Sequence, residues 1–358
     1  MTTVGAQTPE ARAAAYLKEQ WQSSGAPAVS MAVASKGRIV FSTGVGFADL
    51  DNLVPASGST VCNIGSVSKV MTAVAVMQLV ELGTVRLDDP IQKFVPQFPE
   101  KSAAITIRHL LTHTSGIRHY RSTDFPNGLD GENVQPFESF DEAILVFKND
   151  PLLFTPGAYY LYSSYAVNLL QGVIEKASGQ AFEAFMIANV WGPAGMLQTA
   201  FDVPSRIVAG RAKGYALGQG RPVNNPYGDL TYKFASGGMI ATVDDLVRFG
   251  VALNHGRLLK PETVALMYTP QLPTVLAFHE DGPPSREAFQ QAMLWRIRKD
   301  EAGRVFLHHC GTVHGFNACL VNYTAEDLVI AIASNAQVLG FAPALKVAEF
   351  FRERPTPP

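Results

Sequence analysis

The chain has 358 residues, of which 47% are apolar and 17% charged, with a formal net charge of −2. This is the composition of a globular protein long enough for one large domain or two smaller ones. The near-neutral charge argues against a nucleic-acid or anionic-membrane partner, and no stretch approaches the roughly 18 uninterrupted apolar residues of a transmembrane helix.

The N-terminus and the cysteines leave the cellular compartment open. Residues 1–10 contain no apolar signal region, but Val4–Gln7 would suit the end of a signal peptide that has been removed. We expect a periplasmic or secreted location in that case, and a cytoplasmic one otherwise. Cys62, Cys310 and Cys319 do not make a disulfide framework. One pair is an alternative, but buried thiols are the expectation.

The first two thirds of the chain are predicted to contain a β-hairpin followed by helices. A helix over Ala11–Ser23 precedes two short strands, Val29–Ser35 and Arg38–Gly46, joined by the turn signal Lys36-Gly37. Apolar residues at helical spacing then predict a helix over Ser66–Leu82, stopped by Gly83. Helices alternate with Pro/Gly-rich loops after that, at Ile107–Leu111, Asp141–Phe147, Ala166–Ala177 and Ala181–Asn189.

The last third turns from helix to strand. A helix over Val243–Asn254 has Thr242 as its predicted N-cap, and Pro261 starts a short helix. Four strands follow, at Met293–Arg298, Val305–His309, Asn317–Asn322 and Leu328–Ser334, and a final helix spans Pro343–Arg352.

This order predicts an α/β fold of the α+β type. Strands from both ends of the chain join in one mainly antiparallel sheet flanked by helices, built from residues 1–65 and 235–358. Residues 66–234 form a mostly helical subdomain. A cleft between two such parts is a natural place for a binding site.

The segment Ser66-Val67-Ser68-Lys69 carries the first element of a candidate active site. Residues at i and i+3 share a helix face, so the amine of Lys69 can reach the hydroxyl of Ser66. A serine becomes nucleophilic when a nearby base takes its proton, and the helix N-terminus favours a developing oxyanion. The alternative is that Ser66 is only an N-cap and Lys69 a surface residue.

Tyr162 is the second element, at a junction between a turn and a helix. It follows Pro156-Gly157 and precedes the helix from Ala166, so its phenol can point into a cleft. Two nearby ammonium groups would lower its pKa and make it a proton relay. The alternative is an aromatic patch that covers the next helix, formed with Tyr159, Tyr160 and Tyr165.

The third element is His309-Cys310-Gly311-Thr312, at the end of a predicted strand. Gly311 permits close approach of another chain segment, and the N–H of Thr312 is a candidate oxyanion donor. A metal site from His308, His309, Cys310 and His314 is disfavoured, because neighbouring residues of a strand face opposite sides. The chain has no Gly-x-Ser-x-Gly elbow and no supported nucleotide loop.

In this order, the three elements resemble the serine β-lactamase and penicillin-binding protein superfamily, class C-like branch. The likeness covers nearly the whole chain and includes the segments Asn63–Lys69, Leu87–Pro90, Thr106–Gly116, Ser236–Met239 and Thr242–Leu246. Gly116–Tyr120, Phe147–Leu152 and Lys260–Thr263 resemble the group of mitochondrial serine β-lactamase-like proteins and their bacterial relatives.

The resemblance implies one β-lactamase/transpeptidase-like catalytic domain and a mechanism without metal or cofactor. It implies that Ser66 attacks a carbonyl and becomes acylated, and that Lys69 and Tyr162 share general-base and general-acid duty. The N–H groups of Ser66 and Thr312 would hold the oxyanion, and water would then hydrolyse the acyl-enzyme.

Two departures from the family pattern bear on the substrate. Ser164 stands where class C β-lactamases have Asn, which removes an amide that grips the substrate. His309 stands where they have Lys, and an unperturbed histidine is mostly neutral at pH 7. Arg118 is a candidate for supplying that charge, against the alternative of a salt-bridging surface arginine.

The expected partner is a small-molecule or peptide substrate, either a β-lactam, a D-Ala peptide or an ester, and these two departures rank the β-lactam last. We expect hydrolysis of peptides, D-amino-acid peptides or esters. The alternatives are a true class C-like β-lactamase, a penicillin-binding sensor that acylates without turnover, and a structural protein on a decayed enzyme fold. No oligomeric state is predicted.

Overall fold

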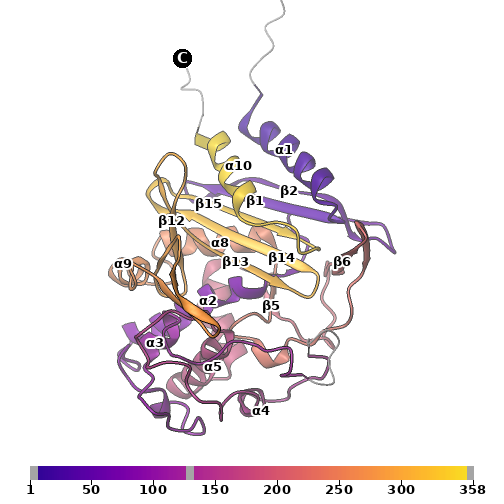
Figure 1. The fold of residues 1–358 in the computed structure, drawn as a ribbon. Coiled ribbons are helices and arrows are strands. Elements are labelled where there is room, and N and C mark those ends of the chain that lie inside the picture. The colour runs from indigo at the N-terminus through magenta and orange to yellow at the C-terminus, as the bar shows by residue number, and fades with distance from the viewer. Residues whose placement is uncertain (1–6, 126–132, 353–358) are drawn as a thin grey trace, which may run out of the picture.

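The computed structural model describes residues 7–125 and 133–352, and an eight-stranded sheet lies at its centre (Figure 1). The neighbouring strands are antiparallel, in the order β11-β12-β13-β14-β15-β1-β2-β3. Their bounds are β1 Ala28–Ser35, β2 Arg38–Asp49, β3 Val54–Pro55, β11 Gln290–Gln291, β12 Arg296–Lys299, β13 Val305–Val313, β14 Phe316–Tyr323 and β15 Leu328–Ser334. Of the expected signal-peptide remnant Val4–Gln7, residues 4–6 lie outside the described residues.

The two ends of the chain meet in the middle of this sheet. β1 pairs with β2 through a tight turn at Lys36 and Gly37, whose φ angles of 50° and 78° suit a two-residue hairpin. Its other edge pairs with β15, in a register that places Val29 opposite Ser334. The predicted hairpin and the joining of the terminal strands are therefore both present.

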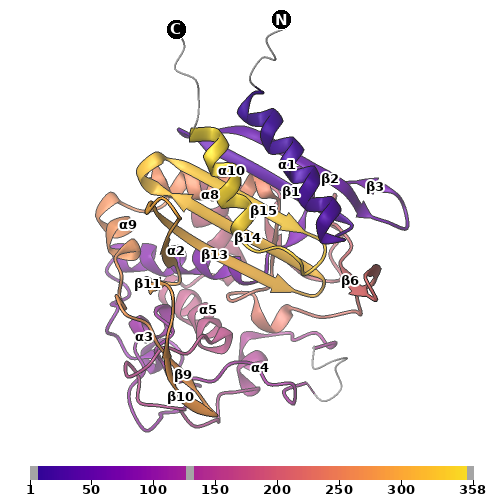
Figure 2. The same cartoon turned by 45° about the horizontal axis from the view of Figure 1, so that its top comes forward.

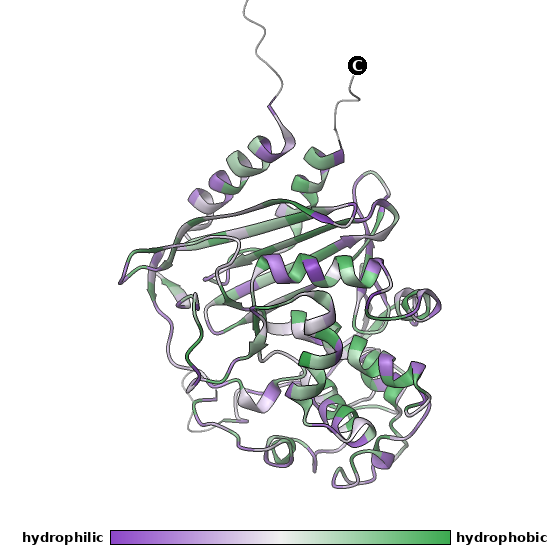
Figure 3. Cartoon of the chain, turned by 180° about the vertical axis from the view of Figure 1, so that it is seen from behind, coloured by the Kyte–Doolittle hydropathy of each residue, from purple (hydrophilic) through white to green (hydrophobic). Residues whose placement is uncertain are grey.

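Helices cover both faces of the sheet, because its central strands are buried on both sides. On β1, Met31 and Val33 belong to one hydrophobic cluster and Ala32 and Ala34 to the other, as the two-residue period of a strand requires. The cluster that contains Met31 and Val33 is covered by α1 (Pro9–Ser24) and α10 (Ala342–Arg352), which lie side by side (Figure 2). The cluster that contains Ala32 and Ala34 is covered by α2 (Ser68–Glu81) and α8 (Val243–Asn254). Figure 3 shows hydrophobic residues along the strands that lie between the two layers of helices.

Most of the helices lie on the side of the sheet that α2 and α8 cover (Figure 1). Their bounds are α1 Pro9–Ser24, α2 Ser68–Glu81, α3 Ile107–Leu111, α4 Phe140–Leu145, α5 Ser164–Ser178, α6 Phe182–Met186, α7 Gly192–Ala194, α8 Val243–Asn254, α9 Pro261–Tyr268 and α10 Ala342–Arg352. Thr242 caps α8 by accepting a hydrogen bond from the N–H of Asp245, as predicted. Nearly all of α2 is buried, which is typical of a helix in the centre of a core.

Short elements connect these layers. They are the 3₁₀ turns η1 Gly65–Val67, η2 Ile91–Lys93, η4 Thr231–Lys233 and η5 Thr324–Glu326, the π-helical turn η3 Ile187–Trp191, and the strands β4 Cys62–Asn63, β5 Ala200–Phe201, β6 Tyr215–Gly218, β7 Arg221–Asn224, β8 Met239–Ala241, β9 Leu276–His279 and β10 Gly282–Arg286. The small sheet β4-β8-β5 leads directly into η1 and α2, so it positions the Ser66 segment.

The predicted fold class is confirmed, but two local predictions are wrong. The strand over Met293–Arg298 starts only at Arg296, because the N–H groups of Met293 and Leu294 bond to Met267 and Leu111 rather than to a strand. Cys310 and Cys319 are not thiols: they lie directly opposite each other on β13 and β14 and form a disulfide. Only Cys62 is a buried thiol among the described cysteines.

No helix in the described ranges is both long enough and apolar enough to cross a bilayer.

Candidate active site

Ser66 lies in the 3₁₀ turn that enters α2, half-buried, with its hydroxyl in a cleft. The turn is shaped by Gly65, whose φ of 49° is in the left-handed region, and is tied down by a 2.7 Å hydrogen bond from the Ser68 hydroxyl to the Gly65 carbonyl. Neither η1 nor α2 has a side-chain N-cap. The N-cap alternative for Ser66 is therefore wrong, and its hydroxyl is available for other contacts.

Lys69 is fully buried one turn further along and faces Ser66. Its Nζ lies 3.0 Å from Ser66 Oγ, 2.9 Å from Ser164 Oγ and 2.6 Å from the carbonyl oxygen of Ser236. Burial lowers the pKa of Lys69 well below its ordinary value, and the positive charge of Arg296 lowers it further. A neutral amine here can donate to Ser164 and Ser236 while its lone pair accepts the Ser66 proton.

Tyr162 approaches Ser66 from the other side. Its phenol donates a 2.7 Å hydrogen bond to Ser66 Oγ, and its ring packs on His113 at a centroid distance of 4.6 Å and edge-on to His119 at 5.4 Å. Burial raises the pKa of Tyr162 above its ordinary value, while the bond to Ser66 and the charge of Arg296 oppose that rise. The expectation of a lowered pKa is therefore wrong, and the phenol is held as a proton donor.

The start of α5 holds Tyr162 and Ser164 in place. Ser163 is the N-cap of this helix, since its hydroxyl accepts from the N–H of Ala166 and donates to the carbonyl of Arg118. The N–H of Ser164 donates to Nδ1 of His119 over 3.2 Å. Ser164, expected to contact substrate, lines the cleft and also contacts Lys69.

β13 brings Gly311 and Thr312 against the turn that carries Ser66. A Cβ on Gly311 would lie 2.4 Å from the Ser66 nitrogen, and one on Gly65 would lie 2.9 Å from the Thr312 nitrogen. The side chain of Asn317, on β14, donates to the Gly311 carbonyl and to the Thr312 hydroxyl. Two backbone nitrogens thus meet beside the Ser66 hydroxyl, an arrangement suited to an oxyanion.

His309 lies on the same face of β13 as Gly311, with its ring 6.3 Å from that of Tyr162. Its Nδ1 is 2.8 Å from the Cys310 carbonyl, which can only accept, so Nδ1 carries the proton and Nε2 the lone pair. Burial and the charges of Arg296 and Lys69 lower the pKa of His309 well below its ordinary value. The ring is therefore uncharged at neutral pH.

Arg118 does not line the cleft. Its guanidinium is buried and donates 2.8 Å and 2.6 Å bonds to the carboxylates of Asp124 and Asp150, and it also bonds the carbonyls of His119 and Val146. The neighbouring carboxylates raise the pKa of Arg118. The idea that Arg118 supplies the missing substrate charge is not supported, because its guanidinium is already paired with two carboxylates and Arg118 does not line the cleft.

Arg296 is one of the cleft cations that the sequence analysis did not predict. It starts β12, and its guanidinium carbon lies 5.4 Å from the Tyr162 ring centroid and 5.0 Å from that of Phe289. It makes no ion pair with any residue in the described ranges. Its signal in the sequence was weak, because a strand arginine usually faces solvent, and only the pairing of β12 with β13 brings it to the site.

The cleft that these residues share has a volume of about 710 Å³. Its described lining includes Arg121, Lys233 and Arg296 but no aspartate or glutamate. Within the described ranges, no group of three or more His, Cys, Asp or Glu side chains is arranged to hold a metal.

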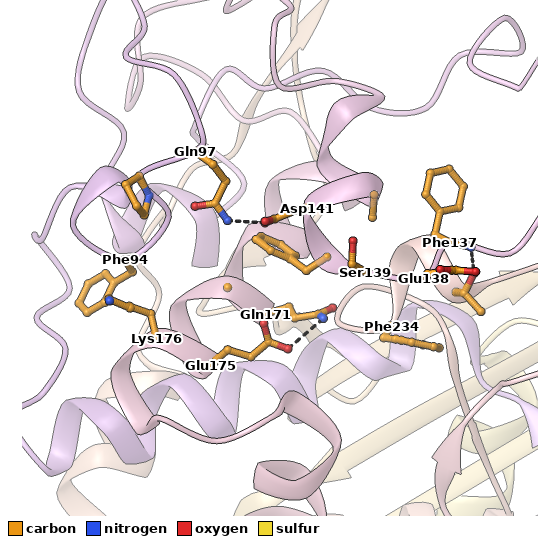
Figure 4. A pocket seen from close by; sticks show the side chains of 15 residues that line it. Phe94, Gln97, Phe137, Glu138, Ser139, Asp141, Gln171, Glu175, Lys176 and Phe234 are labelled. Atoms are coloured by element: carbon orange, nitrogen blue, oxygen red, sulfur yellow. Dashed lines mark hydrogen bonds between the residues drawn. The ribbon is translucent and has the colours of Figure 1, made fainter.

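A second cavity, of about 660 Å³, is lined by residues of α4, α5 and η4 (Figure 4). Its lining combines phenylalanines with the carboxyl groups of Glu138, Asp141 and Glu175. Gln97 donates to Asp141 and Gln171 donates to Glu175. Among its described lining residues no nucleophile is hydrogen-bonded to a base, so the cleft at Ser66 is the candidate active site.

Comparison with known proteins places the whole chain in one family. A family model described as Beta-lactamase matches residues 13–349. The mitochondrial serine beta-lactamase-like protein LACTB of Homo sapiens is 30% identical over 431 residues, covering 92% of this chain and 77% of that protein. Esterase EstB of Burkholderia gladioli is 30% identical over 264 residues, covering 65% of this chain and 67% of the esterase.

Solved structures agree in fold. The octameric penicillin-binding protein homologue from Pyrococcus abyssi superposes with a TM-score of 0.80 at 25% identity, covering 94% of this chain and 77% of that chain. D-amino acid amidase from Ochrobactrum anthropi SV3 superposes with a TM-score of 0.78 at 20% identity, covering 95% and 99%, which shows the fold alone. The chain therefore belongs to the beta-lactamase family and is a serine hydrolase of the beta-lactamase fold.

Proposed function

We propose that Ser66 is the nucleophile of an acyl-transfer reaction that hydrolyses peptides, D-amino-acid peptides or esters. The observation that carries this proposal is the position of Ser66 Oγ, 3.0 Å from the amine of Lys69 and 2.7 Å from the phenol of Tyr162. A hydroxyl between a base and a proton donor is the arrangement that nucleophilic catalysis needs.

Each residue then has one role in acylation. Neutral Lys69 takes the Ser66 proton as Oγ attacks the carbonyl carbon, and the N–H groups of Ser66 and Thr312 stabilise the oxyanion. Tyr162, whose raised pKa keeps it protonated, donates to the leaving group and regains a proton from Lys69. Water completes the cycle by attacking the acyl-enzyme.

Neutral His309 and the short Ser164 support the ranking of peptides and esters above β-lactams. Neither residue offers the ammonium or the amide that the family pattern uses to hold a β-lactam. The proteins that this chain resembles include an esterase and a D-amino acid amidase, which is consistent with this ranking.

The test is the intact mass of the protein after incubation with a nitrophenyl ester, a D-Ala-D-Ala peptide and a penicillin. We expect the ester or the peptide to add one acyl group that is lost within minutes, and Ser66→Ala to show no adduct and a rate at least about 1000-fold lower. An adduct that persists in Ser66→Ala would exclude Ser66 as the nucleophile. A stable penicillin adduct with no turnover of ester or peptide would instead favour the sensor.

Arg296 suggests that the preferred substrates carry a carboxylate. Its guanidinium faces the cleft beside Tyr162 without an ion-pair partner in the described ranges, and the described cleft lining has no acidic residue. A substrate carboxylate placed there would gain a charge-assisted hydrogen bond, worth about 1.5–3 kcal/mol.

We therefore expect Arg296→Gln to lower kcat/KM for a nitrophenyl hemisuccinate by about 10- to 100-fold and for nitrophenyl butyrate by far less. Arg296→Lys should recover part of the loss. Arg298→Gln is the matched control, since Arg298 is also half-buried on β12 but does not line the cleft. Equal losses on both esters would show that Arg296 acts on the catalytic groups and not on the substrate.

A further inference from the structure

The disulfide between Cys310 and Cys319 lies one residue away from the proposed oxyanion site. Cys310 directly precedes Gly311, which packs against the Ser66 nitrogen, and Thr312 follows. The carbonyl of Cys310 also accepts a hydrogen bond from Nδ1–H of His309. Any movement of β13 at Cys310 is therefore passed to Gly311, Thr312 and His309 through the backbone.

The two cysteines differ in burial. Cys319 is fully buried in the cluster beneath α1 and α10, whereas Cys310 is half-buried, packs against the edge of that cluster and is also part of the cleft lining. We therefore expect a small thiol from solvent to attack at Cys310 and not at Cys319. Cys319 is held by the packed core on its side of the sheet.

From this placement we propose that the Cys310–Cys319 disulfide is a redox-sensitive tie, that is, a cross-link that holds β13 with Gly311 and Thr312 in its active position. The proposal rests on the proposed function for its activity readout. A dithiol thiolate attacks the Cys310 sulfur, forms a mixed disulfide and expels the Cys319 thiolate, which takes a proton. The second thiol of the reagent then closes its own disulfide and releases Cys310 as a thiol.

Reduction increases the distance that the sulfurs of Cys310 and Cys319 must keep from each other. A disulfide holds its sulfurs about 2 Å apart, whereas unbonded sulfurs sit at van der Waals distance, roughly 3.5–4 Å. Because Cys319 is enclosed by the core, the adjustment falls on Cys310 and on β13. The remaining ladder keeps the sheet folded, since β13 pairs with β14 from Leu307 to Val313.

The expected effect is on the rate and not on substrate binding. A misplacement of 1 Å can cost about 100-fold in rate, so a partial shift at Thr312 should lower kcat by about three- to tenfold. KM should change little, because the oxyanion forms only in the transition state.

The experiment compares the protein oxidised with glutathione disulfide and then reduced with dithiothreitol, using the ester that the enzyme turns over. Thiol labelling under denaturation should find one free thiol, Cys62, before reduction and three after it. Cys319→Ala should show the lower kcat in both states. Cys62→Ala, which removes the buried thiol outside the disulfide, should respond to the reductant as the wild type does.

Amide hydrogen exchange gives a readout that does not need activity. Reduction should speed exchange in a peptide covering residues 305–316, and Cys319→Ala should exchange quickly in both states. A protein without esterase activity that still shows this change would contradict the proposed function and support the tie. Three free thiols after oxidation, or complete reduction with unchanged kcat and unchanged exchange, would overturn the tie.

Discussion

At the scale of single residues, burial favours the uncharged forms of the titratable groups packed around Ser66, while the cations Arg121, Lys233 and Arg296 line the cleft beside them. Tyr162 is surrounded by His113, His119 and His309, and burial lowers the pKa of each of these histidines. The pKa of Lys69 is lowered and that of Tyr162 is raised, so a base and an acid coexist at the same pH. This separation of pKa values suits the roles of base and acid that we propose for Lys69 and Tyr162.

A pH profile of kcat/KM follows from these directions. Lys69 must be neutral to act as the base, so activity should be lost only when the pH falls through its lowered pKa. Tyr162 must keep its proton, so the alkaline loss should lie above pH 10, its ordinary pKa. We expect a plateau that includes neutral pH, measured with an ester from pH 4 to 11. Activity that appears only near pH 10.4, the ordinary lysine value, would contradict a neutral Lys69.

At the scale of elements, the contact between β13 and η1 decides the geometry of the site. Gly311 and Ser66 are 245 residues apart in sequence (311 − 66), yet the backbone of Gly311 touches that of Ile64 and Ser66. No side chain fits between the two backbones, which explains why residue 311 is a glycine. A turn does not explain it, because the φ angle of Gly311 is not in the left-handed region.

Gly311→Ala should therefore disable the site. Its Cβ would lie 2.1 Å from the Ile64 carbonyl oxygen and 2.4 Å from the Ser66 nitrogen, so β13 or η1 must move. We expect kcat/KM to fall by about 100-fold or more and the free energy of unfolding to fall by about 1–3 kcal/mol, measured by ester hydrolysis and urea denaturation. Gly282→Ala, where the new Cβ meets no atom within 4 Å, is the control. Wild-type activity in Gly311→Ala would refute this packing.

At the scale of the whole molecule, buried histidines make stability depend on pH. His308 packs beneath Phe341 and beside Phe306, and neither ring nitrogen has a hydrogen-bond partner among the described residues. Burial lowers its pKa to about 3, and burial likewise lowers the pKa of His314 to about 3. The native state stays unprotonated at these positions while the unfolded chain takes up protons below pH 6.5.

The sign of the effect follows from proton binding. Between pH 6.5 and 3 the unfolded state binds more protons, so stability falls as the pH falls, by about 1.4 kcal/mol per pH unit for each such histidine. His308→Phe should remove one histidine's share of this slope while keeping an aromatic ring in the cluster. Urea unfolding at pH 7, 5.5 and 4.5 measures it, with His279→Phe, an exposed position, as the control. An unchanged slope in His308→Phe would show that the ring is already protonated in the native state.

Local patterns predicted a large part of both fold and site. The helix Val243–Asn254 and the strand Leu328–Ser334 are observed with their predicted bounds, because their apolar periodicity and flanking residues are local signals. Ser66 and Lys69 were predicted as a pair because a helix brings i and i+3 together whatever the rest of the chain does.

Other features needed the tertiary structure. The Met293–Arg298 strand was predicted too long, since only the packed fold shows that Met293 and Leu294 bond to other segments. Arg118 and Arg296 carry the same charge. Nothing in the sequence around either residue reveals that Arg118 pairs with Asp124 and Asp150 whereas Arg296 faces the cleft. The Cys310–Cys319 bond likewise required the register of β13 and β14.

By itself, then, the sequence predicted the fold class from its periodicity, and it predicted Ser66, Lys69 and Tyr162 as catalytic residues through the resemblance of the three motifs, in their order, to the β-lactamase family. Periodicity and short spacing act over a few residues, so they indicate the elements but not the roles. The tertiary structure alone decided that Lys69 is buried without a carboxylate partner among the described residues, that Tyr162 keeps its proton, and that β13 lies against Ser66. Burial and long-range contact set the charge of each group, and the charge sets what the motif can do.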